Sequence, residues 1–169
     1  MLVTSTCNAD PTNPSRLLAT YGFHDTSPPA TYCKLFPDLE VVGQDLIDMG
    51  FDYTTMVFYP ESGGISEQVW DVMLYTLLGQ QDRNTQQQFY QAHRAGDANT
   101  KQQFHQYYLT QTASALVNHI DEILSEISYC DGKLNSGQYF ENMQMIAGHN
   151  EFVRQTFLKV RANLQQMMM

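Results

Sequence analysis

The amino-acid sequence predicts a mainly α-helical domain, in which a bundle of long helices follows a short β ribbon. From residue 65 onward, apolar residues recur at the three-, four- and seven-residue spacings of helices buried along one face. Two short segments rich in aromatic and β-favouring residues come before them, and each ends at a proline, Pro37 or Pro60. The chain has 169 residues, 43% of them apolar, which is enough for one domain with a buried core.

The first segment with a recognisable pattern is residues 13–23, Asn-Pro-Ser-Arg-Leu-Leu-Ala-Thr-Tyr-Gly-Phe. Its opening Asn13-Pro14-Ser15 is a turn and helix-start signal, because proline fixes φ and Asn or Ser can cap the first turn. Two leucines and Tyr21 follow at helical spacing, and Gly22 is the residue type that helix C-termini favour. These residues alone predict a short buried helix with Tyr21 in its core.

The same segment resembles the end of the catalytic domain in SET-domain protein-lysine methyltransferases of the Rubisco large-subunit methyltransferase type, where it has the form Ser-Asn-Ala-Glu-Leu-Leu-x-x-Tyr-Gly-Phe. In that family a helical substrate-binding domain comes next. The resemblance therefore implies a remnant of the SET domain over residues 1–27 and a Rubisco methyltransferase substrate-binding-like helical domain over residues 28–169. The Pro28-Pro29 pair marks the boundary.

The site residues implied by the resemblance lie in this segment. The phenol of Tyr21 would lie at the lysine channel and hydrogen-bond the substrate amine. The rest of the motif consists of Asn13, Ser15, Gly22 and Phe23. A second tyrosine is expected thirteen positions before Tyr21, but Asn8 stands there and has no phenol. The Asn-His-Ser pattern that holds S-adenosylmethionine in the family occurs nowhere in the chain.

The resemblance implies S-adenosylmethionine-dependent methylation of a protein lysine, although a related group uses histidine as the acceptor. Because residues 1–23 are too few to enclose the cofactor, we expect this chain to be the C-terminal portion of such an enzyme. It would supply the lobe that binds the protein substrate, and would not catalyse the reaction by itself. The alternative is a stand-alone, non-catalytic helical interaction module, which Asn8 favours. A third possibility is an accidental resemblance and an unrelated helical scaffold.

The expected ribbon consists of two strands, within residues 31–36 and 53–59. Between them, residues 39–49 have helical spacing, and Gly50 provides a C-terminal stop. An isolated two-stranded ribbon is marginally stable, so we expect it to pack against another element.

Four helices are predicted after the ribbon. The expected bounds are Ser66 to Gly79, residues 82–94, about 98 to 128 in one piece, and about 136 to 166 with a weak point at Gly148. The second is expected to be exposed, because it has few apolar residues among repeated glutamines. Turns are expected at Gly96-Asp97 and Asp131-Gly132. Basic residues near the end of the fourth helix, Arg154, Lys159 and Arg161, are interpreted as a solvated face.

Charge and hydropathy limit the classes of partner. The formal net charge is −9 with only nine Lys and Arg, which disfavours nucleic acid and favours a neutral or basic protein. No run of eighteen apolar residues exists, so no membrane partner is expected, and the N-terminus lacks the pattern of a signal peptide. We therefore expect a soluble intracellular protein. Its compartment stays open among the cytoplasm, the nucleus and, as the resemblance alone implies, the plastid.

The cysteines and histidines predict no metal site. Cys7, Cys33 and Cys130 are odd in number and far apart, unlike a disulfide framework or a Cys-x-x-Cys ligand pair. The five histidines form no His-x-x-x-His pair, so each is interpreted as a surface or capping residue. The glycine-rich nucleotide-binding patterns and the Gly-x-Ser-x-Gly elbow of hydrolases are also absent from the sequence.

Overall fold

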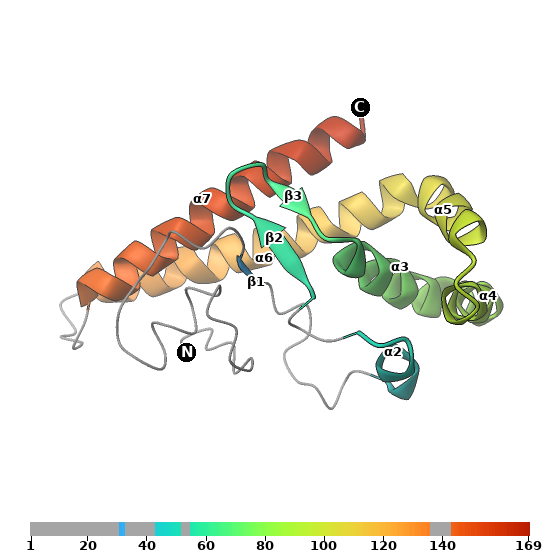
Figure 1. Cartoon of the computed structure of the whole chain (residues 1–169). Helices are drawn as coiled ribbons and strands as arrows, with labels where there is room; N and C mark the ends of the chain where they lie inside the picture. Colours follow the sequence, from blue (N-terminus) through green and yellow to red (C-terminus); the bar gives the residue numbers. More distant parts are fainter. Residues whose placement is uncertain (1–30, 33–42, 52–54, 136–142) are drawn as a thin grey trace.

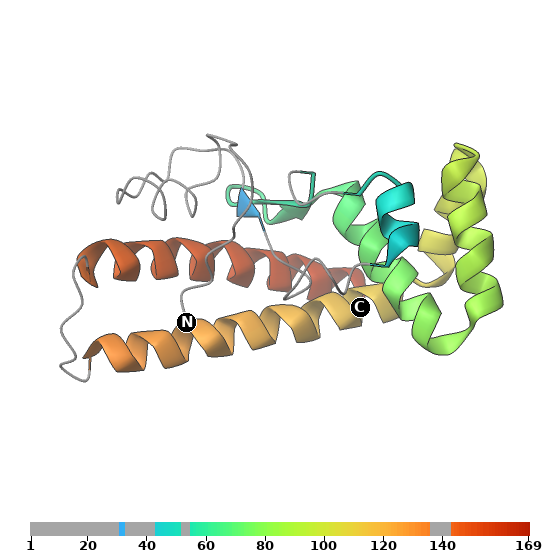
Figure 2. The same ribbon diagram turned by 90° about the horizontal axis from the view of Figure 1, so that it is seen from below.

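The computed structural model describes residues 31–32, 43–51, 55–135 and 143–169. Within these ranges the chain has six helices and three short strands, so the prediction of a mainly helical fold with a small β ribbon is confirmed. Two long helices, α6 (Leu109–Asn135) and α7 (Met143–Met167), run antiparallel side by side (Figures 1 and 2). The shorter helices gather at one end of this pair, and the strands lie along α7.

The strands form one antiparallel sheet in the order β1 (Thr31–Tyr32), β2 (Val57–Tyr59) and β3 (Gly64–Ile65). Phe58 is central, with Thr31 and Ile65 as its partners on the two sides. The pairing of the two predicted strands is therefore confirmed. The third strand was not predicted, because a two-residue strand beside a turn gives no alternation of polar and apolar residues.

The β2–β3 turn is attached to α7. Lys159 donates from Nζ to the carbonyl of Pro60 at 2.9 Å, and Asn163 donates from Nδ2 to the carbonyl of Ser62 at 2.9 Å. Gly63 is buried here with a φ of +66°, and a Cβ on it would lie 2.9 Å from the backbone carbon of Lys159. Only glycine combines this backbone conformation with so close an approach of α7.

Gly63→Ala is expected to destabilise the fold by more than Gly96→Ala. Both glycines have positive φ, which costs a residue with a Cβ about 1 kcal/mol or more, but the space around Gly96 is open. Only the Gly63 variant must also push α7 away. Urea unfolding of the two variants beside the wild type measures the difference, and equal losses would contradict the close approach.

The helix before β2 is shorter than predicted. It is α2 (Gln44–Asp48), and residues 39–42 of the predicted helix lie outside the described ranges. Gly50, with a φ of +81°, ends it as expected. The Tyr75 hydroxyl donates to Asp45 at 2.6 Å and ties α2 to the next helix. Burial and this carboxylate raise the pKa of Tyr75.

The prediction that a helix ends at Gly79 is wrong. Helix α3 (Glu67–Gln81) continues through it to Asp82, which caps the exposed helix α4 (Arg83–Arg94) by accepting from the Asn84 amide. Gln86 of α4 lies against Gly79, where a Cβ would be 2.5 Å from Gln86 Nε2, and it donates to the Tyr75 carbonyl. Glycine thus serves the packing of the two helices rather than the end of one.

The single helix predicted over residues 98–128 is two helices, α5 (Ala98–Tyr107) and α6. A straight helix cannot place Phe104 edge-on to Phe89 of α4, with ring centroids 5.7 Å apart, and also follow α7. The chain therefore bends at Tyr108. Tyr107, the last residue of α5, is 76% exposed.

Helices α6 and α7 also continue through glycines that were expected to weaken or end them. α6 extends past Asp131-Gly132 to residue 135, and α7 contains Gly148. In each case the cost of a helical glycine, about 1 kcal/mol, is small compared with burial of a long apolar face.

The core lies where α3, α6 and α7 meet the sheet. Phe58 and Phe157 contact edge to face with centroids 5.1 Å apart. Other fully buried side chains include Val69, Leu74, Leu78, Leu116, Ile120, Val160 and Leu164. These are mainly the residues that the helical spacing predicted.

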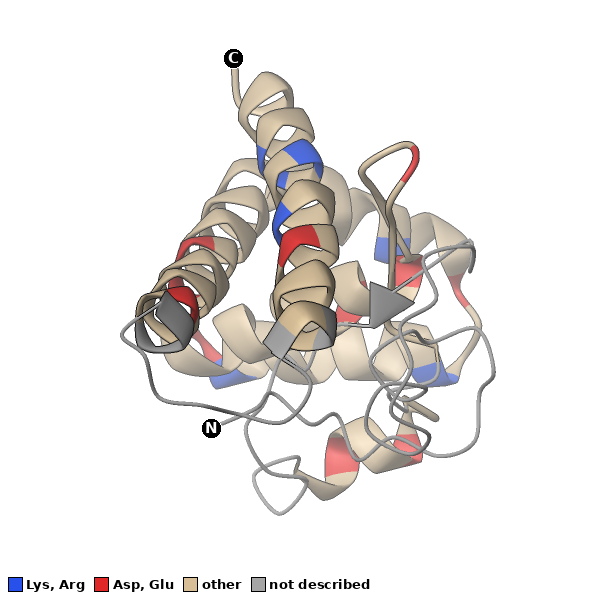
Figure 3. Cartoon of the chain, turned by 90° about the vertical axis from the view of Figure 1, so that its left-hand side faces the viewer, with Lys and Arg blue, Asp and Glu red and all other residues tan. Residues whose placement is uncertain are grey.

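The basic residues of α7 do more than cover a solvated face. Arg161 pairs with Asp121 of α6 at 2.7 Å, and Arg154 pairs with Asp131 of α6 and with Glu151. Figure 3 shows Lys and Arg positions in blue along α7 and Asp and Glu positions in red along α6. The charges therefore connect the two long helices.

None of the helices that the structure describes is long and apolar enough to cross a membrane.

Candidate functional site

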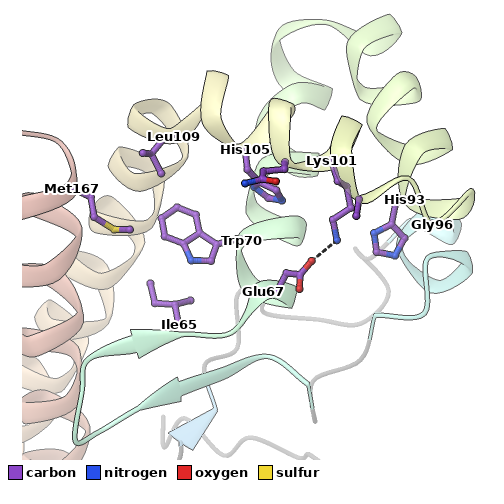
Figure 4. Close-up of a pocket in the computed structure, with 11 residues that line it drawn as sticks. Ile65, Glu67, Trp70, His93, Gly96, Lys101, His105, Leu109 and Met167 are labelled. Atoms are coloured by element: carbon purple, nitrogen blue, oxygen red, sulfur yellow. Dashed lines mark hydrogen bonds and ion pairs between the residues drawn. The ribbon is translucent and has the colours of Figure 1, made fainter.

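A pocket of about 660 Å³ lies where α3, α4 and α5 meet β3 and the ends of α6 and α7 (Figure 4). Its lining is divided by polarity. Apolar side chains gather at one end, namely Ile65, Trp70, Leu109 and Met167. Polar and charged side chains gather at the other, namely Glu67, His93, Lys101 and His105. Gln102 also lines the pocket. The pocket therefore suits a group with an apolar part and a polar or charged part.

The polar end is built around Asp71, whose side chain is only 2% exposed. Its Oδ1 accepts from His105 Nε2 at 2.7 Å, and its Oδ2 accepts from Lys101 Nζ at 2.8 Å. Lys101 also donates to Glu67 at 2.7 Å. The Asp71 cluster, defined as Glu67, Asp71, His93, Lys101 and His105, thus joins α3 to α4 and α5.

The backbone of α3 sets the position of this cluster. Ser66, directly before the helix, accepts from the Val57 amide at 3.0 Å and donates to the Thr55 carbonyl at 2.9 Å. The start of α3 is therefore fixed to β2. On α5, Asp97 caps the helix by accepting from the Thr100 amide at 3.1 Å, one residue before Lys101.

Burial alone would raise the pKa of Asp71, but hydrogen bonds from His105 and Lys101 outweigh it, so the pKa lies below the ordinary value. Burial alone would lower the pKa of Lys101. The hydrogen bonds from Lys101 to Asp71 and Glu67 outweigh the effect of burial, so the pKa of Lys101 lies above its ordinary value. Asp71 and Lys101 are therefore a charged pair over the whole neutral range.

The fold should lose stability in acid through Asp71. Because its folded pKa is lowered, its contribution is complete above the ordinary aspartate value and disappears as the pH falls through the folded value. We expect the free energy of unfolding to decrease below about pH 4, and this decrease to be smaller in Asp71→Asn. Urea unfolding at a series of pH values measures it, and parallel curves for the two proteins would contradict the role of Asp71.

His93 borders the pocket from α4. Its Nε2 lies 3.1 Å from the Met49 carbonyl, which only accepts, so Nε2 carries a hydrogen. Its buried Nδ1 has no hydrogen-bond partner among the described residues and lies 3.7 Å from Asp71 Oδ2.

The cluster differs from the site that the sequence predicted. Asn13, Ser15, Tyr21, Gly22 and Phe23 all lie outside the described residues, as does the domain boundary at residue 28. The interpretation of every histidine as a surface or capping residue is wrong for His149, which is buried, whereas His93 and His105 are half-buried and lie beside a buried carboxylate.

The one sequence signal for this site was Asp71 itself. It interrupts the apolar run from Val69 to Leu74, where an acidic residue needs a partner when the helix is buried. The identity of the partners could not be inferred, since they are 30 and 34 residues away on another helix.

The chemistry available in the pocket is ion pairing, hydrogen bonding and apolar contact. In the described part of the chain, no three His, Cys, Asp or Glu side chains are grouped so as to hold a metal ion. Cys130 is half-buried and is a free thiol.

Comparison of the chain with protein-family models, with curated proteins and with solved structures finds no match.

Proposed function

We propose that this chain is a non-catalytic helical protein-binding module, and that it contacts its partner through the pocket beside Asp71. The observation that carries the proposal is the division of the pocket into an apolar end and a charged end, the latter held by the hydrogen bonds among Glu67, Asp71, Lys101 and His105. A site that binds one protruding side chain of a protein partner needs this combination, because apolar contact provides affinity and fixed polar groups provide specificity.

The state of the charged groups supports binding rather than catalysis. A general base or nucleophile works best with a pKa near the working pH and with its reactive atom unoccupied. Lys101 instead has a raised pKa and two carboxylate partners, and both oxygens of Asp71 accept hydrogen bonds. These groups stabilise one another and define the shape of the pocket.

Trp70 makes the proposal testable, since it is the single tryptophan of the chain and lines the pocket. We expect its indole NMR signal to shift on titration with at least one of three short leucine-containing peptides that carry lysine, glutamine or glutamate. Leu109→Asp, at the apolar end, should abolish the shift. Leu158→Asp, on the exposed side of α7, is the matched control and should retain it. An unchanged Trp70 signal with all three peptides would contradict the proposal.

We further propose, from residues 13–23, that the module is the substrate-binding lobe of a longer SET-domain protein-lysine methyltransferase. Its cofactor would be S-adenosylmethionine, and Tyr21 would lie at the lysine channel. The resemblance of that segment and the mainly helical fold that follows it support this proposal. The Asn-His-Ser tripeptide of the family does not occur in the sequence, so we do not place the cofactor in the pocket beside Asp71.

The mass of the endogenous polypeptide tests this second proposal. An antibody against the α6–α7 pair followed by intact mass spectrometry is expected to find a protein much heavier than 19.3 kDa, with a cofactor-binding sequence before residue 1. In that protein Tyr21→Phe should reduce methyl transfer to a protein substrate. A product of 19.3 kDa would contradict the proposal and leave the stand-alone binding module.

A further inference from the structure

We infer that the group bound in the pocket is a positively charged side chain on an apolar stem, such as a lysine or arginine of a basic protein segment, and that Glu67 is its charge partner. The inference rests on the proposed binding function and adds the chemical class of the ligand. It depends on three features of the described residues, which are the charge balance of the cluster, the position of Glu67 beside Trp70, and the acidity of the chain.

The first feature is a carboxylate without a full counter-charge. Two carboxylates, Glu67 and Asp71, share the ammonium group of Lys101 at 2.7 and 2.8 Å. Asp71 is buried and also accepts a hydrogen bond from His105, so its negative charge is the one that the Lys101 ammonium group must balance. Glu67 is 69% exposed, and one carboxylate can accept several hydrogen bonds. The charges of Glu67, Asp71 and Lys101 therefore sum to minus one, and a second cation would balance them.

The second feature is the arrangement of α3. Glu67 and Trp70 are three residues apart on this helix and so lie on the same face, and both line the pocket. In Figure 4 the indole of Trp70 lies between the apolar side chains and Glu67. A cation that pairs with Glu67 can therefore also contact the face of the aromatic ring, which attracts cations. Its aliphatic stem would pack against Ile65 and Leu109.

The third feature is the net charge of −9, which attracts basic partners and disfavours acidic ones. Lys101 does not make the pocket attractive to acidic ligands, because its positive charge is balanced by the Asp71 carboxylate at 2.8 Å. A ligand carboxylate would have to displace Glu67 from Lys101 and would leave two acidic groups facing each other. A ligand cation needs neither change.

The test uses the full chain and three matched peptides, acetyl-Gly-Leu-Lys-Leu-Gly-amide and its forms with glutamine or glutamate in place of lysine. Affinity is measured from Trp70 fluorescence and the indole NMR signal. We expect the lysine peptide to bind roughly tenfold more tightly than the glutamine peptide, from the ion pair and the contact with the indole. Binding should weaken as salt increases.

Two variants locate the effect at Glu67. Glu67→Gln should weaken binding of the lysine peptide by about two- to fivefold and leave the glutamine peptide unchanged. Glu122→Gln is the matched control, since Glu122 is an equally exposed acid on α6 that does not line the pocket, and it should change neither affinity. Circular dichroism verifies that both variants remain folded.

The outcomes separate this inference from the proposed function. If the glutamine or glutamate peptide binds as well as the lysine peptide, the inference is overturned while the binding module stands. Equal effects of Glu67→Gln and Glu122→Gln would also overturn it, because the attraction would then belong to the net charge alone. If none of the peptides alters Trp70, the proposed function fails together with the inference.

Discussion

Replacement of Asp71 by alanine is expected to lower the free energy of unfolding by about 3–5 kcal/mol, as the loss of one partner from a buried ion pair usually does. The variant would leave Lys101 and His105 without their shared acceptor while both remain largely covered by protein. Because the lost bonds join α3 to α5, we also expect the pocket to lose its shape. Urea denaturation followed by circular dichroism measures the first effect, and the Trp70 NMR signal reports the second.

Glu67→Ala is the matched control for this variant. It removes the other carboxylate from the same lysine, but Glu67 is largely exposed, and exposed ion pairs contribute about 0–1 kcal/mol. Asp71→Asn keeps the size of the side chain and one acceptor while removing the charge, so its loss should lie between the two. Equal losses for Asp71→Ala and Glu67→Ala would show that burial of Asp71 does not matter, contrary to the structure.

The second large effect is expected in the core. Phe157→Ala should cost about 3–5 kcal/mol, since it removes a buried ring and leaves a cavity against Phe58. Leu158→Ala, one position further on the exposed side of α7, should cost much less. Thermal or urea unfolding distinguishes them, and similar losses at the two positions would mean that α7 packs with a different face.

A double-mutant cycle refines this test. The Phe58 and Phe157 rings contact edge to face, a geometry that contributes about 0.5–1.5 kcal/mol beyond the area it buries. The combined variant should therefore lose less stability than the sum of the two single variants. Additive losses would indicate that the two rings do not contact each other in solution.

The sequence predicted the helices well wherever a local signal agreed with the packing. Gly50 was expected to end a helix and Gly96 to lie in a turn, and both have the positive φ angles typical of such positions. Gly79 also follows an apolar helical stretch in the sequence, but it lies inside a helix, where α4 packs against it. A glycine identifies a place where the backbone has freedom or space, and only the neighbouring element decides which of these is used.

The bend at Tyr108 and the Asp71 cluster could not be predicted for a related reason. The apolar spacing is continuous from α5 into α6, so nothing local indicates that two helices must follow different neighbours. For the cluster, an acid in an apolar run shows that some partner exists. Which lysine and which histidines supply it depends on how α3 and α5 cross, and that is a tertiary property.

The attachment of the β2–β3 turn to α7 has a consequence for the order of events during synthesis. The bonds from Lys159 and Asn163 reach back 99 and 101 residues along the chain. At about 5–20 residues per second, a ribosome needs roughly 5–20 s to produce the chain between the two contacts. During that interval Phe58 lacks the ring of Phe157 that covers it in the finished fold. The hairpin therefore cannot reach its final packing until α7 has been synthesised.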